Sequence, residues 1–169
     1  MFLYLKIREA HAAIGRELAL TGTERPRAVR NTVIVPVPAS PNRIVLAAVE
    51  YARSMSPEVI AVHVNTEQHD GAGMRVAWKR FVDDVPLIIL ESPHHSVLRP
   101  LLRFIDEMAA LRTDGKLTVV LPELVPDQRW QRLLHNRISS LLKEELLYRP
   151  GVIVTSVRYH MKSPPPGKA

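Results

Sequence analysis

The most informative stretch of the sequence is Thr32-Val33-Ile34-Val35-Pro36-Val37, a short apolar run rich in β-branched residues. An apolar run without alternating polar positions indicates a strand that is covered on both faces of its sheet. Similar runs follow at residues 59–64, 86–90, 116–121 and 152–157. Successive runs begin roughly 27 to 36 residues apart, close to the ~30 residues of a strand–helix–strand unit.

Helical patterns occupy the intervals between these runs. The spacing predicts a helix from Asn42, as its N-cap, to Met55, a shorter helix at 74–81, and a third with Ser96 as N-cap. The strongest helical periodicity lies at 130–146. Strands and helices in regular alternation predict the α/β class, here a doubly wound, mostly parallel five-stranded sheet with flanking helices.

The two ends of the chain differ from this regular middle. Residues 1–30 are predicted to form a juxtamembrane helix and a linker, 31–160 the α/β domain, and 161–169 a disordered, proline-rich tail. The helical stripe near the start is weak, with Ile14 and Leu18 among its apolar positions. An ordinary N-terminal helix packed on its own domain is the alternative.

Composition narrows the possible functions. The 169 residues suit a single domain. The absence of cysteine excludes disulfides, thiolate metal sites and thiol catalysis. The net charge of +6 comes without runs of consecutive Lys or Arg and with few aromatic residues, which disfavours a nucleic acid polymer as partner. Residues 1–30 hold six basic and three acidic groups, so we interpret them as a basic collar beneath a membrane.

Residue patterns for catalysis are sparse. Ser92-Pro93-His94-His95 places a serine near two histidines, but no glycine-flanked nucleophile turn surrounds it. The seven histidines show no i, i+4 pairing on a predicted helix. We therefore predict no catalytic residues, no metal site and no cofactor, and a protein that is not an enzyme.

A ligand site is predicted where the winding of the sheet reverses, beyond the carboxyl ends of the first and fourth strands. The segments there are 38–43 and 122–128, which hold prolines and no glycine, so we interpret them as stiff loops without a phosphate cradle. Arg43 is the leading anion donor, beside the helix N-terminus at Asn42. The alternative is that Asn42 is only a cap and Arg43 is solvated.

Two histidine positions have competing interpretations. His63 lies inside the second predicted strand and is most simply a core or strand-end histidine with its hydrogen bonds satisfied. His135-Asn136 lies on the strongest predicted helix, where a polar pair either braces the helix against a loop or contributes to a ligand or partner surface.

Several segments, taken in order, resemble one family. They are Asn31–Val37, Asn42-Arg43, Tyr51–Ser56, Ala61–Val64, Val85–Pro93, Arg99–Leu102, Thr118–Glu123 and Leu133–Asn136. Together they are similar to the cytosolic C-terminal domain of KimA-type potassium importers, which have also been classed as amino acid permeases of the APC superfamily.

This resemblance implies a universal-stress-protein-like fold that follows the last membrane helix, at the cytoplasmic face of the cell membrane. It also implies a homodimer, contact with the protein's own transmembrane domain, and proton-coupled potassium import that cyclic di-AMP inhibits. The ligand residues that we predict on this basis are Val37, Pro38, Asn42, Arg43, His63, His135, Asn136 and Arg137.

The fifth strand is expected at the edge of the sheet, where an unpaired strand can join its two-fold mate. We therefore predict a dimer interface along Val152, Val154 and Ser156. Two alternatives to the regulatory function stay open. One is a ligand-free structural dimerisation domain of an amino acid permease. The other is a stand-alone protein of the universal stress type, either nucleotide-binding or a small hydrolase.

Overall fold

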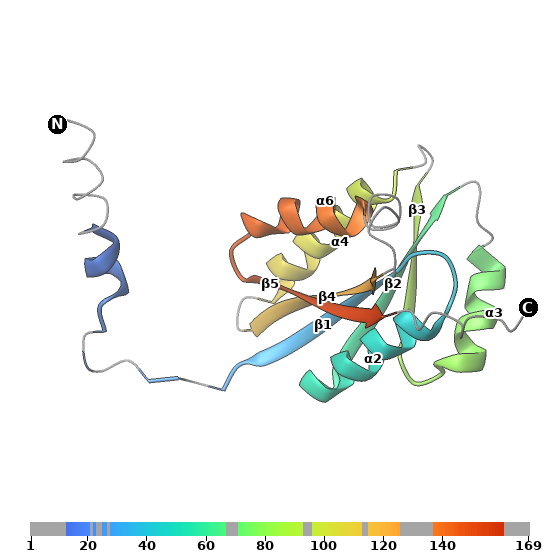
Figure 1. Cartoon of the computed structure of the whole chain (residues 1–169), viewed down its shortest axis with the longest axis horizontal. Coiled ribbons are helices and arrows are strands. Elements are labelled where there is room, and N and C mark those ends of the chain that lie inside the picture. The colour runs from blue at the N-terminus through green and yellow to red at the C-terminus, as the bar shows by residue number, and fades with distance from the viewer. Residues whose placement is uncertain are drawn as a thin grey trace, which may run out of the picture.

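The computed structural model describes residues 13–20, 22, 25–26, 28–66, 71–92, 96–112, 115–125 and 137–160. From residue 30 onward these form one sheet with helices on both faces (Figure 1). The elements are β1 (Arg30–Val37), α2 (Arg43–Met55), β2 (Glu58–Thr66), α3 (Gly71–Phe81), β3 (Leu87–Ser92), α4 (Leu98–Leu111), β4 (Gly115–Val125), α6 (Arg137–Leu147) and β5 (Val152–His160).

The sheet has the strand order β3-β2-β1-β4-β5, and every neighbouring pair is parallel. The predicted doubly wound, five-stranded sheet is confirmed, and it is wholly rather than mostly parallel. From β1 the chain winds outward to β2 and β3, then crosses back to β4 and β5. The winding therefore reverses between β1 and β4, as predicted, and β5 lies at an edge.

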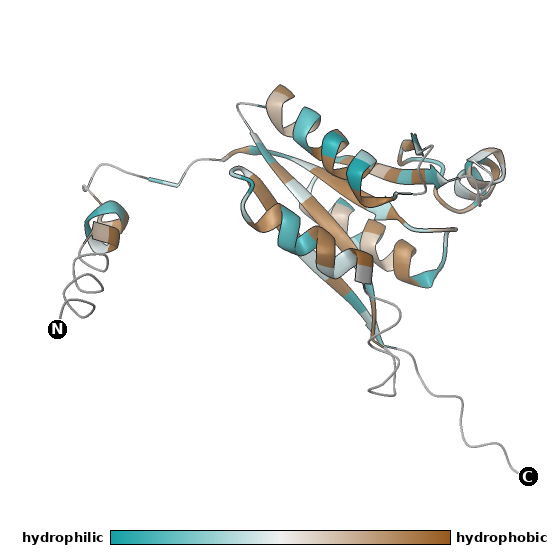
Figure 2. Cartoon of the chain, turned by 90° about the horizontal axis from the view of Figure 1, so that it is seen from above, coloured by the Kyte–Doolittle hydropathy of each residue, from teal (hydrophilic) through white to brown (hydrophobic). Residues whose placement is uncertain are grey.

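Each face of the sheet has its own apolar core, which explains why the strands read as unbroken apolar runs. Val33, Val35 and Val37 of β1 pack on the side of α2 and α3. Ile34 points to the other side, among residues of α4 and α6. Figure 2 shows the strands coloured mainly as hydrophobic, whereas the helices carry hydrophobic and hydrophilic residues on different sides.

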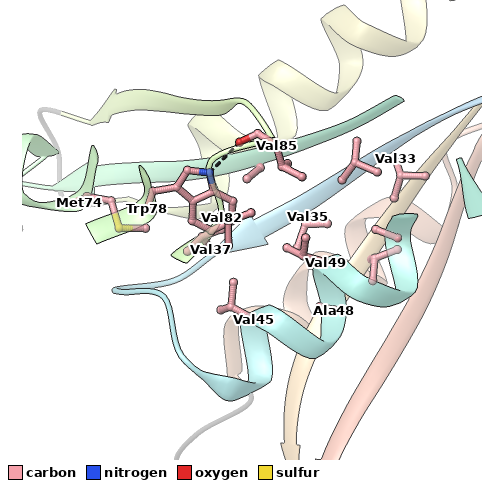
Figure 3. Packing of buried hydrophobic residues seen from close by; sticks show 14 residues of the cluster. Val33, Val35, Val37, Val45, Ala48, Val49, Met74, Trp78, Val82 and Val85 are labelled. Atoms are coloured by element: carbon pink, nitrogen blue, oxygen red, sulfur yellow. Dashed lines mark hydrogen bonds between the residues drawn. The ribbon is translucent and has the colours of Figure 1, made fainter. Parts of the chain in front are cut away.

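Trp78 anchors α3 to the sheet. Its side chain is buried in the cluster that contains the β1 valines. The indole Nε1 donates a hydrogen bond of 2.8 Å to the carbonyl oxygen of Val85 (Figure 3). This bond gives the buried indole N–H a hydrogen-bond partner. Trp78 can therefore be buried between α3 and the sheet without an unsatisfied polar atom.

Two sequence predictions concern the residues that cap the first turns of α2 and α4. Asn42 caps α2 as predicted, because its Oδ1 accepts hydrogen bonds from the amides of Ile44 and Val45. The prediction that Ser96 caps α4 is wrong. That helix begins at Leu98, with Val97 at the cap position and no side-chain cap bond. Ser96 lies one residue too early, and its carbonyl oxygen instead accepts a hydrogen bond from the Ser92 hydroxyl.

The fourth strand is longer than the sequence suggested. We expected it to end at Leu121, with a stiff loop at 122–128, but β4 runs to Val125. The reason is that β5 pairs beside it for this whole length, up to Val125 opposite His160. Residues 126–128 lie outside the described residues, as does the part of the fourth predicted helix before Arg137.

Residues 13–18 form a helix, and every side chain from 13 to 20 is exposed. Ile14 and Leu18 are 52% and 74% exposed, so the alternative of a helix packed on its own domain is not observed for these residues. In Figure 1 this helix lies apart from the sheet. No helix in the described ranges has both the length and the apolar character needed to cross a membrane. The juxtamembrane role, the tail at 161–169 and the domain boundaries stay predictions.

Candidate functional site

A gap opens between β1 and β4 at their carboxyl ends. Their pairing stops at Ile34 opposite Val119, whereas β1 remains paired to β2 through Val37 opposite His63. Pro36 follows two residues after the last pair with β4. A proline has no N–H, so the ladder between β1 and β4 cannot gain its next hydrogen bond from this residue.

Pro122 has the same effect from the other strand. The amide of Leu117 donates to Gly151 beside β5, so by strand alternation the even-numbered residues of β4 direct their amides toward β1. Pro122 is one of these. The two prolines therefore remove consecutive hydrogen bonds from the same ladder, and the central strands separate where the winding reverses.

This gap leads into a cavity of about 430 Å³. It lies where the first turns of α2, α4 and α6 meet the carboxyl ends of β1, β2 and β4. The described residues that line it are Pro36, Val37, Pro38, Asn42, Ile44, Val45, Val62, Val64, Val97, Leu101, Leu121, Pro122, Leu124, Ile138, Ser139 and Leu142. None of these lining residues carries a charge. The cavity therefore suits an uncharged, largely apolar group with few hydrogen-bonding atoms.

Three of the predicted ligand residues, Val37, Pro38 and Asn42, line this cavity together. Asn42 already accepts two hydrogen bonds, from the amides of Ile44 and Val45 at 3.0 and 3.1 Å. These amides are the ones that a helix N-terminus would offer to an anion. Arg43 is exposed at the start of α2 and is not a lining residue. The alternative of Asn42 as a cap and Arg43 as a solvated residue therefore agrees with the geometry.

His63 is not one of the residues that line this cavity, although it lies beside Val37, which is. It is 1% exposed, and its Nδ1 is 2.9 Å from the carbonyl oxygen of Val37. The lining residues of the same strand, Val62 and Val64, point to the opposite face. The structure thus places His63 in the core at a strand end, next to the predicted ligand residue Val37 but outside the cavity lining.

The remaining predicted residues are distributed differently. His135 and Asn136 lie outside the described residues, and Arg137 is the first residue of α6, with a side chain that is not described. On β5, Val152 and Val154 pack against the core beneath α4 and α6, and the Ser156 hydroxyl donates to Glu123. The side chains of Val152 and Val154 thus face inward, so pairing along this edge would use the backbone.

The sequence prediction missed a charged cluster beside the cavity. Glu123 of β4 is 6% exposed and forms an ion pair with Lys143 of α6. Its carboxylate also accepts a hydrogen bond from Ser156 Oγ at 3.2 Å, and Arg158 Nε lies 3.8 Å away. The alternation of Leu117, Val119, Leu121 and Glu123 places Glu123 on the same face of β4, but a loop that starts at Pro122 hides this pattern in the sequence.

The fold and the sequence segments that resemble a known family both point to the same assignment. The family model described as KimA potassium transporter C-terminal domain matches residues 28–159. The chain belongs to this family. One relative of the chain is the potassium transporter KimA of Bacillus subtilis strain 168, 27% identical over 164 residues. The match covers 96% of this chain and 27% of that transporter.

Membership in the KimA C-terminal domain family confirms the resemblance seen in the sequence. It makes this chain a transporter-associated domain, and the relative is a transporter rather than an enzyme. Because the chain spans only about a quarter of the relative's length, the family assignment describes the domain and not a complete transport pathway. Within the described ranges, no group of three or more acidic or histidine side chains could hold a metal ion.

Proposed function

We propose that this chain is the regulatory and dimerisation domain, at the cytoplasmic face of the membrane, of a proton-coupled potassium transporter. In this proposal the domain binds cyclic di-AMP, and binding inhibits transport. The match to the KimA C-terminal domain over residues 28–159 supports the link to a transporter. The named relative is a potassium transporter, which supports potassium rather than an amino acid as the solute.

The cavity between β1 and β4 carries the ligand part of the proposal. Open α/β sheets bind ligands beyond the carboxyl ends of their strands, where the winding reverses. The cavity occupies this place, and none of the described residues that line it carries a charge. Adenine is neutral, flat and largely apolar on its faces, so its chemistry matches the lining. The phosphates of cyclic di-AMP would remain outside, near cationic side chains such as Arg43.

The dimer part of the proposal is supported by the position of β5. It is an edge strand of nine residues, and among the strands that the structure describes it has one neighbour, β4. The strand order therefore leaves its other edge open to a second copy of the chain. A two-fold dimer also suits a ligand with two equivalent halves, because each half then meets the same residues.

Isothermal titration calorimetry on the chain and on the full-length transporter that carries it tests the ligand. We expect heat of binding with cyclic di-AMP and weaker binding after Arg43→Ala. Arg80→Ala, which removes an exposed cation on α3, is the matched control and should leave the affinity unchanged. Unchanged affinity in Arg43→Ala would remove Arg43 from the site. No heat with either protein at high micromolar concentration would overturn the proposed ligand.

Potassium uptake by the full-length transporter tests the regulation. Cyclic di-AMP should reduce uptake, and deletion of residues 31–160 should abolish this reduction. The position of β5 also favours a second candidate, a structural domain that dimerises the transporter without a ligand. That candidate predicts a dimer whose uptake does not respond to cyclic di-AMP.

A further inference from the structure

The cavity can hold only part of a charged ligand. The lining residues that the structure describes are uncharged, and a phosphate placed among these valines and leucines would lose its hydration without a compensating partner. Any phosphate on the ligand must therefore lie at the rim of the cavity. There it needs cationic side chains or free backbone amides.

The first turn of α2 offers little to such an anion. The Asn42 side chain engages the amides of Ile44 and Val45, and the amide of Leu46 donates to the carbonyl oxygen of Asn42. An anion would have to displace the cap of the helix to reach these groups. At this helix start, a phosphate contact would therefore have to come mainly from side chains such as Arg43.

The Glu123 cluster lies at the same rim, on the side of α6. Leu121 lines the cavity, and Glu123 follows two residues later on the same face of β4. Ser139 of α6 also lines the cavity, and Lys143 follows one helical turn later on the same side of that helix. The cluster thus borders the cavity through two separate elements.

The cluster holds more positive than negative charge. Glu123 contributes one negative charge, and Lys143 and Arg158 contribute one positive charge each. Lys143 forms the close pair, with the Glu123 side chain 8% exposed. Arg158 lies farther away, at 3.8 Å, and its side chain is 67% exposed. The guanidinium is therefore mostly exposed, and its charge is available to an outside partner.

We propose that Arg158, beside Glu123 and Lys143, binds a phosphate group of a ligand whose uncharged ring occupies the cavity. A guanidinium suits this task because its planar set of N–H donors matches phosphate oxygens. The choice of cyclic di-AMP as probe rests on the proposed function. The phosphate contact itself applies to any ligand that combines a neutral ring with a phosphate.

Three variants and three probes test this inference. Arg158→Gln removes the proposed contact. Glu123→Gln removes the negative charge and keeps a hydrogen-bonding side chain. Arg75→Gln on α3, across the sheet, lowers the net charge as Arg158→Gln does and serves as the control. Each folded variant, checked by thermal melting, is titrated with cyclic di-AMP, adenosine and inorganic pyrophosphate, and chemical shifts of backbone amides report binding.

We expect Arg158→Gln to weaken cyclic di-AMP and pyrophosphate binding about tenfold and to leave adenosine binding unchanged. Glu123→Gln should act in the opposite direction on pyrophosphate and tighten its binding by about two- to fivefold, because one negative charge is removed beside the site. Arg75→Gln should change none of the three affinities. Opposite effects of two neighbouring substitutions would not follow from a loss of structure.

The remaining outcomes separate this inference from the proposed ligand. Cyclic di-AMP binding that Arg158→Gln does not alter would overturn the inference and leave the proposed function in place. Equal weakening of adenosine and pyrophosphate would also overturn it, because Arg158 would then act through the fold. Pyrophosphate binding that depends on Arg158, without cyclic di-AMP binding, would support the phosphate contact and overturn the proposed ligand. Binding of none of the probes would overturn both.

Discussion

Glu123 shows how one side chain can connect three elements. It is buried at the carboxyl end of β4 and contacts Lys143 of α6 and two residues of β5, Ser156 and Arg158. A buried carboxylate is tolerated only when its charge is paired and its oxygens accept hydrogen bonds. The cluster therefore constrains where α6 and β5 lie at the rim of the cavity.

Lys143→Met should destabilise the chain by about 2 kcal/mol, because it leaves the buried Glu123 without its closest cation. Urea denaturation followed by circular dichroism measures the change. The double variant Lys143→Met with Glu123→Leu should recover much of the loss, because it replaces a charged pair with apolar groups. A single variant as stable as the wild type would show that the pair does not hold α6 to the sheet.

Glu58, at the amino end of the sheet, should make the stability of the fold depend on pH. A hydrogen bond from the Thr32 hydroxyl, followed by one from Arg112, lowers the pKa of Glu58 below its ordinary value of 4.5. A carboxyl whose pKa is lower in the folded state stabilises the fold above its unfolded pKa. This stabilisation is lost as the pH falls through the folded pKa.

Thermal melting of the wild type should therefore show a falling midpoint as the pH drops from about 5 to about 3. Glu58→Gln should melt lower than the wild type at neutral pH and lose less on acidification. Glu91→Gln, at an exposed carboxyl on β3, is a suitable control. Parallel curves for wild type and Glu58→Gln would contradict the assignment.

At the scale of the elements, the strands and the first helix could be predicted because their signals are local. The run at 32–37 is apolar since β1 is buried on both faces, and Asn42 lies directly before a helical pattern. The extension of β4 past Pro122 could not be predicted in this way, because it depends on pairing with β5. The predicted strand order was enough to locate the cavity. The contributions of α6 and Glu123 to its surroundings could not be predicted, because they depend on packing between segments that are distant in the sequence.

The cap of α2 allows a test that separates its structural role from ligand binding. Asn42→Ala should lower the free energy of unfolding by about 1 kcal/mol, because two amides of the first turn lose their acceptor. Asn42→Asp keeps an acceptor at the same position and should retain most of the stability. Denaturant unfolding measures both. If Asn42→Asp loses as much stability as Asn42→Ala, the hydrogen bonds from Ile44 and Val45 are not the cause.

At the scale of the whole molecule, the two edge strands differ in their surroundings. β5 is the longer edge, with nine residues against six in β3. Ile153 on β5 is 46% exposed, whereas Val154 packs against the core beneath α4 and α6. A charge at Val154 would therefore disturb the protomer itself. Ile153 is the better position for testing assembly.

Ile153→Lys should convert a dimer that pairs along β5 into a monomer, because a lysine on an edge strand opposes pairing with a second copy. Light scattering coupled to size exclusion measures the mass, and thermal melting confirms that the protomer is still folded. Val76→Lys, at an exposed position on α3, is the control and should leave the mass unchanged. A wild type that is monomeric at working concentration would remove the premise, and an unchanged dimer in Ile153→Lys would place the interface elsewhere.

The two prolines that end the ladder between β1 and β4 have a genetic consequence. Pro36 and Pro122 line the cavity, and each lacks the amide hydrogen that could extend the ladder between β1 and β4. A single codon change from proline to a residue with an amide restores a donor, and the strands can then close further toward each other. Such alleles add hydrogen bonds to the fold while they narrow the cavity. Under the proposed function, a screen for transporters that cyclic di-AMP no longer inhibits should recover such alleles as stable protein, at two residues that line the cavity, Pro36 and Pro122.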